Sequence, residues 1–201
     1  MGARECAQGN SSRLPKLWKP RARLGRIAVA AAATARDLPG AIEALKQAQV
    51  HASKTSDERI QVEVWDELGG AMLFGPTPYP DLLEFMRREI EWARERGIAF
   101  SVADGRLGEA YSLAALGEFE SALALLEELI AFFATLPGRV PQHGECYTLA
   151  GRIERDRGNP EAAISLYRRA MDKFDESGHR RWWRNAAPGV VGLMRSALVA
   201  A

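Results

Sequence analysis

Small and apolar side chains recur along the chain with the spacing of one face of an α-helix. The spacing i, i+4, i+7, i+11 places residues on one side of a helix, where they can be buried together. Three stretches follow it: Ala41-Leu45-Ala48-Ala52, Ala122-Leu126-Leu129-Phe133 and Ala163-Tyr167-Ala170-Phe174. A fourth, less regular stripe contains Leu82, Met86, Ile90 and Ala93. The pattern therefore predicts an all-α fold in which each of these helices buries one face.

Glycine, proline and capping residues predict where the helices begin and end. We expect helices over about 24–36, 39–52, 58–74, 80–96, 98–116, 119–136, 144–157 and 160–174. Thr55-Ser56-Asp57-Glu58 has the spacing of a capping box, with a hydroxyl three residues before a carboxylate. Pro160 suits a first helical position, with Asn159 as the N-cap residue.

A second regularity has a period of about 41 residues, within the roughly 20–50 residues that repeat architectures show. Steps of that length join Ala28, Gly69, Ala110, Gly151 and Gly192, all of them Gly or Ala. Small side chains at these positions allow two helices to cross closely. We therefore predict a repeated helix–turn–helix unit.

The unit at Gly144–Phe174 resembles a tetratricopeptide repeat. The residues that match the pattern are Tyr147, Gly151, Gly158, Ala163, Tyr167 and Ala170, and Trp65-Asp66-Glu67-Leu68-Gly69 has the W-x2-L-G start of such a unit. The usual period is about 34 residues. The surplus of seven is about two helical turns, so one extra turn in each helix would leave the buried face unchanged. The resemblance implies a right-handed α-solenoid; the alternative is an unrelated helical bundle with chance periodicity.

This register divides the chain into an arm and a repeat domain. We expect a mobile basic arm at 1–20 and a repeat domain at 21–201. The predicted units are 21–55, 56–97, 98–138 and 139–178, followed by a capping segment at 179–201. The apolar residues of that last segment suggest either that the repeat array is cut there or that the segment contacts a second copy of the chain.

Trp65–Gly97 is similar to a more specific family. Its leucine-glycine pair, Gly75-Pro76-Thr77-Pro78 turn and Arg- and Glu-rich helix resemble the repeats that follow the ATPase module of bacterial, especially actinobacterial, cyclase-domain proteins and related transcriptional regulators. The likeness extends over about 56–178. It implies a role in contacting partners or relaying a signal. The phosphate-binding loop G-x-x-x-x-G-K-[ST] is missing, so the ATPase activity does not transfer.

Charge is uneven although the formal net charge of the chain is only +1. Residues 1–26 hold seven basic side chains and one acidic one, or about +6, whereas the rest holds 20 basic and 25 acidic, or about −5. The arm could contact nucleic acid, fold back on the body or remain solvated. The segment Arg180–Arg184, with Trp182 and Trp183, could stack on bases or pack internally.

Catalytic and cofactor motifs are not recognisable. Cys6 and Cys146 form no disulfide framework, which favours a reducing cytoplasm. His143 and Cys146 lack a second pair that would complete a zinc site. No apolar run reaches the length of a membrane span. We therefore predict a cytoplasmic protein that is not an enzyme and needs no cofactor or metal.

A binding surface is the better hypothesis for function. The resemblance implies that side chains of the first helix of each unit line a concave face. They are Glu63, Asp66, Gly70, Leu73, Asp104, Leu107, Tyr111, Glu145, Thr148, Arg152 and Arg155. Arg152 and Arg155, three apart on one helix, could meet a carboxylate or phosphate or could simply be solvated. The prediction is a scaffold for a peptide or partner domain; the alternative is a nucleic-acid-associated regulator using the arm and Arg180–Arg184.

Overall fold

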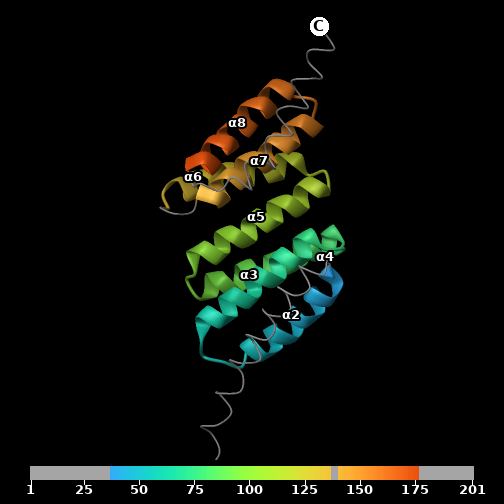
Figure 1. Ribbon diagram of the computed structural model, residues 1–201, viewed down its shortest axis with the longest axis vertical. Coiled ribbons are helices and arrows are strands. Elements are labelled where there is room, and N and C mark those ends of the chain that lie inside the picture. Colours follow the sequence, from blue (N-terminus) through green and yellow to red (C-terminus); the bar gives the residue numbers. More distant parts are fainter. Residues whose placement is uncertain (1–36, 137–139, 177–201) are drawn as a thin grey trace, which may run out of the picture. The chain divides into compact units, whose positions relative to one another are not determined.

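The computed structural model describes residues 37–136 and 140–176, which form seven α-helices and no strand (Figure 1). The helices are α2 (Leu38–Ala52), α3 (Glu58–Phe74), α4 (Tyr79–Glu95), α5 (Ala99–Ala115), α6 (Phe119–Ala134), α7 (Val140–Asp156) and α8 (Pro160–Glu176). The helical pattern therefore predicted each of them, mostly to within two residues. Only the start of α7 differs more, since it begins at Val140 instead of Gly144.

Several predictions fall outside the described residues. They concern the arm at 1–20, the helix at 24–36 with Ala28, the segment Arg180–Arg184, and the terminal segment at 179–201 with Gly192.

The chain divides between Pro78 and Tyr79 into two compact units. In the first unit α2 packs against α3; in the second, α4, α5, α6, α7 and α8 pack in sequence, each against the next. The boundary lies inside the segment 56–97, between its two helices, so the pairing of α3 with α4 as one repeat stays a prediction.

The hydrophobic stripes are buried as predicted. Every member of the four stripes is at most 5% exposed. Each stripe holds a helix onto its neighbours, since burying one Leu or Phe side chain contributes roughly 1.5–3 kcal/mol. The stripe therefore decides which face of each helix turns inward.

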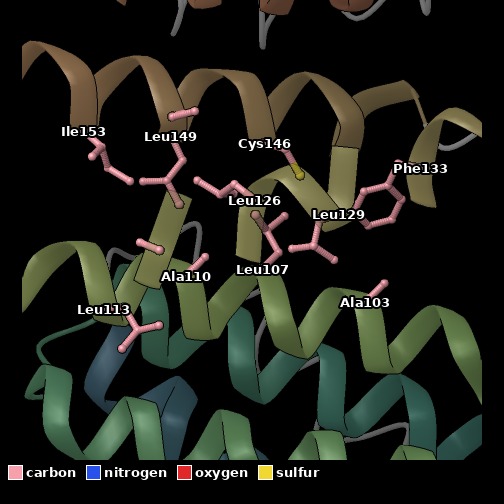
Figure 2. Packing of buried hydrophobic residues seen from close by; sticks show 12 residues of the cluster. Ala103, Leu107, Ala110, Leu113, Leu126, Leu129, Phe133, Cys146, Leu149 and Ile153 are labelled. Atoms are coloured by element: carbon pink, nitrogen blue, oxygen red, sulfur yellow. The ribbon is translucent and has the colours of Figure 1, made fainter. Parts of the chain in front are cut away.

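An extensive cluster of buried apolar side chains joins α5, α6 and α7. Figure 2 shows Leu107 and Leu113 of α5 on one side, Leu149 and Ile153 of α7 on the other, and Leu126 of α6 beside them. This core fixes the position of α5 relative to α7.

Glycines allow the closest helix approaches. A Cβ atom at Gly151 would lie 3.0 Å from the ring of Tyr167, and one at Gly144 would lie 2.5 Å from the ring of Phe174. Both glycines are on α7 and both aromatic residues are on α8, which lie side by side (Figure 1). The prediction of a small residue at position 151 thus has a direct packing reason.

The predicted capping box at Thr55 is wrong. The N-cap residue of α3 is Asp57, and its side chain makes no capping hydrogen bond. The Thr55 hydroxyl instead accepts a hydrogen bond from the Asp57 N–H at 3.1 Å, and the Thr55 carbonyl accepts one from the Gln61 side chain at 2.7 Å. The hydroxyl therefore stabilises the turn before the helix, because an N–H two residues ahead is within its reach.

Candidate functional site

Two predicted surface residues, Asp104 on α5 and Glu145 on α7, interact although they are far apart in the sequence. They occupy equivalent positions one period apart. Tyr111 and Arg152 are the next such pair, and the charge of Arg152 acts on the Tyr111 hydroxyl. Because α5 and α7 contact each other, the repeat brings its equivalent side chains together.

Glu145 has a strongly perturbed carboxyl group. Its pKa is raised to about 7, first because burial removes water from the carboxylate and second because Asp104 repels a negative charge there. At neutral pH both the protonated and the ionised form of the group are therefore populated. A positive charge placed between Asp104 and Glu145 would offset both causes and favour the ionised form.

Tyr111 lies near Glu145. Its pKa is raised, chiefly by burial and then by the charge of Glu145, whereas Arg152 acts in the opposite direction. The phenol therefore stays protonated and can donate a hydrogen bond. Arg152 itself is exposed and makes no ion pair with the described residues. Asp104, Tyr111, Glu145 and Arg152 are called the α5–α7 cluster below.

The two other predicted positions on α7 already have partners. The Thr148 hydroxyl donates to the Gly144 carbonyl at 2.9 Å. The Arg155 guanidinium donates to Asp156 Oδ1, with N–O distances of 2.8 Å from Nε and 2.7 Å from Nη2. The side chains of that ion pair are 43% and 48% exposed, so the pair can open to a ligand at low cost.

Leu107 does not belong to a binding surface. Its side chain is 5% exposed and packs in the core between α5, α6 and α7. The prediction of Leu107 as a surface residue is wrong because position 107 faces inward on α5 toward Leu126 and Leu149, as Figure 2 shows.

The four predicted positions on α3 lie in the first unit. Glu63 is exposed, and Asp66, Gly70 and Leu73 are half-buried. Their positions are described only relative to other residues of that unit.

His143 and Cys146 are core residues. Cys146 is fully buried, which raises the pKa of its thiol, so the reactive thiolate is disfavoured. The His143 ring stacks on Tyr147 with a centroid distance of 5.1 Å, and burial lowers its pKa. Within residues 37–136 and 140–176, no group of three or more His, Cys, Asp or Glu side chains could hold a metal ion.

Sequence reasoning missed one feature, a cavity of about 350 Å³ beside α4, α5 and α6 that Arg94 and Arg106 border. The only feature of the sequence that relates the two arginines is the turn at Gly97, which lies between them. As for membranes, the helices of the described part are all too short or too polar to span one.

Comparison with known proteins agrees with this architecture. Residues 101–176 match the tetratricopeptide repeat family. No curated protein has a significantly similar sequence.

Two solved structures are similar to this chain. Both are of a Podosopora anserina protein described as a kinesin light chain, whose TPR-like repeats are nearly identical to one another, and the second structure is of a single-substitution variant. The TM-scores are 0.56 and 0.57 at 15% identity. The matches cover 91% and 92% of this chain and 97% of each of the others. The chain thus has an all-α fold of tetratricopeptide-like helical repeats.

Proposed function

We propose that the chain is a non-catalytic scaffold that binds a peptide or partner domain across α5 and α7. The observation that carries the proposal is the coupling of Asp104 with Glu145. Two partly desolvated carboxyl groups that repel each other provide favourable surroundings for a cation. Tetratricopeptide repeats generally bind other proteins, which makes a basic side chain of a protein partner the natural ligand.

The rest of the cluster extends this recognition. Tyr111 supplies a hydroxyl near Glu145, and Arg152 supplies a positive charge that is in no ion pair with a described residue. A partner segment with a lysine or arginine followed by an acidic residue would complement both charges.

The similarity of Trp65–Gly97 to bacterial signalling proteins supports a place in a cytoplasmic signalling or transcription-regulatory assembly. The partner could then be a parent ATPase, cyclase or regulator domain. A contact between two copies through residues 179–201 is compatible with this role.

The test is affinity capture from a lysate of the native cell with three baits: the parent, Arg152→Glu and Arg168→Glu. Arg168 is an exposed arginine of α8 and serves as the matched control. We expect a protein that the parent and Arg168→Glu retain and Arg152→Glu loses. Equal capture by all three baits would contradict a role for the α5–α7 cluster. Capture of nuclease-sensitive material by all three would favour the nucleic-acid alternative.

A further inference from the structure

The cavity beside α4, α5 and α6 has an apolar interior. Five of its lining residues carry apolar side chains: Ala99, Val102, Ala103, Leu129 and Phe132. Ala103 and Leu129 are at most 4% exposed and belong to the core, so they form a rigid floor. Val102 and Phe132 are half-buried and remain within reach of a ligand.

The aromatic wall of the cavity is held in place. The Phe132 ring packs edge-to-face against Phe133, with a centroid distance of 5.5 Å and an interplanar angle of 67°. Phe133 is 2% exposed and cannot move freely. A ligand would therefore meet a preformed apolar surface, which lowers the entropy cost of binding.

Two arginines border the cavity, and Arg94 supplies the positive charge of its rim. Arg94 on α4 is exposed and has no ion pair among the described residues. Arg106 on α5 forms an ion pair with Glu128, which offsets its charge. It still has N–H groups for a ligand carboxylate, since a guanidinium carries five in all. No described acidic residue lines the cavity. The rim is thus complementary to carboxylates, which arginine can bind through two parallel hydrogen bonds.

We propose that this cavity binds an acidic partner peptide through one large apolar side chain. A volume of about 350 Å³ is at the lower end of ligand sites, which span roughly 300–1,000 Å³, so it suits one anchoring Leu, Phe or Trp side chain. The Glu or Asp residues that flank this anchoring side chain bind Arg94 and Arg106 through their carboxylates. This surface is separate from the α5–α7 cluster and has the opposite charge preference.

The probes are three sets of fluorescein-labelled hexapeptides, measured by fluorescence anisotropy. The first set places one Leu, Phe or Trp among glutamates; the second replaces each glutamate with lysine; the third replaces the apolar residue with glycine. We expect saturable binding of the first set and at least tenfold weaker binding of the other two. Failure of every member of the first set to bind would overturn the proposal.

Three variants localise the binding. Val102→Trp should fill the cavity and Arg94→Glu should reverse the charge of its rim, each weakening binding at least tenfold. Arg88→Glu is the control, since Arg88 is on α4 but does not line the cavity, and 62% of its side chain is exposed. Arg94→Glu does not alter the packing and remains informative if Val102→Trp misfolds. Unchanged binding by Arg94→Glu would overturn the assignment to this cavity. So would tighter binding of octanoate than of any peptide, since it would identify a small apolar acid as the occupant.

Discussion

Gly151 of α7 and Tyr167 of α8 lie so close that a Cβ atom at position 151 would be 3.0 Å from two carbons of the tyrosine ring. The same atom would be 3.3 Å from the Ala163 carbonyl oxygen. Tyr167 is 2% exposed and Ala163 is fully buried, so neither can withdraw. The crossing of the two helices therefore depends on the absence of a side chain at position 151.

Replacement of Gly151 with leucine should separate α7 from α8. We expect a loss of roughly 1–3 kcal/mol in the free energy of unfolding, because extra atoms in a packed core force backbone shifts. Urea denaturation followed by circular dichroism measures it. Gly70→Ala is the control, since a Cβ atom at Gly70 meets nothing within 4 Å; it should stabilise by about 0.5–1 kcal/mol, because glycine is unfavourable inside a helix. An unchanged stability of Gly151→Leu would show that the helix pairing is wrong.

Two other buried glycines, Gly144 and Gly108, should differ in how much their replacement with alanine destabilises the fold. A Cβ atom would approach Phe174 to 2.5 Å at Gly144 and the Met86 sulfur to 2.5 Å at Gly108. A phenyl ring is rigid, whereas a methionine side chain can adopt another rotamer. We therefore expect Gly144→Ala to cost about 1–3 kcal/mol and Gly108→Ala clearly less, as measured by urea denaturation.

A second substitution tests that explanation. Gly144→Ala combined with Phe174→Leu should cost less than the sum of the two single changes, because the smaller side chain makes room for the new methyl group. Additive costs would show that the contact with the ring is not the cause.

The raised pKa of Glu145 predicts how stability depends on pH. The folded-state pKa of about 7 is above the usual value of 4.5, so between these pH values the folded chain binds more protons than the unfolded one. Stability therefore falls as the pH rises from about 4.5 through 7. Glu145→Gln should remove this slope and stabilise the protein at pH 8 by roughly 1–3 kcal/mol.

Comparison of the parent with Glu145→Gln isolates the contribution of Glu145 to the pH dependence of stability. The lowered pKa of His143 acts in the opposite sense, since stability falls as the pH drops below the usual histidine range. That contribution is common to the parent and Glu145→Gln and cancels in their difference. Urea denaturation at several pH values gives the difference directly, and parallel curves would contradict the raised pKa.

Binding of a basic partner side chain should release a proton from Glu145. A cation beside Asp104 and Glu145 favours the carboxylate, so affinity should increase by up to about tenfold between pH 6 and 8. Calorimetry in buffers with different ionisation enthalpies measures the proton release. Glu145→Gln should abolish both effects; a pH-independent affinity in the parent would mean that the partner's cation binds elsewhere.

The fold could be predicted from the sequence where the deciding interactions lie within one helix or recur from repeat to repeat. The stripes, such as Ala122-Leu126-Leu129-Phe133, were predictable because helical periodicity within one segment decides which face is buried. The small residue at 151 was predictable because the repeat shows the same requirement at Ala110 and Gly69. The capping box failed because Thr55 can bond locally in two ways, and only the folded chain selects one.

The candidate site was predictable only in part. The repeat period places Asp104 and Glu145 at equivalent positions, as it does Tyr111 and Arg152, and within each pair one side chain acts electrostatically on the other. The protonation of Glu145 was not predictable, because desolvation depends on neighbours from another helix. The cavity at Arg94 and Arg106 was missed for the same reason, since three helices contribute to its lining. Leu107 was assigned to the surface because sequence spacing alone did not resolve which side of α5 faces the core.

Hydrogen exchange with the captured partner tests the central claim most directly. The exchange of backbone amides is compared between the free chain and the complex, followed by mass spectrometry. We predict that protection on binding is concentrated in α5 and α7, around Asp104, Tyr111, Glu145 and Arg152, with little change in α8. Protection confined to α8 or to the basic residues 1–26 would contradict a partner-binding surface built on the α5–α7 cluster.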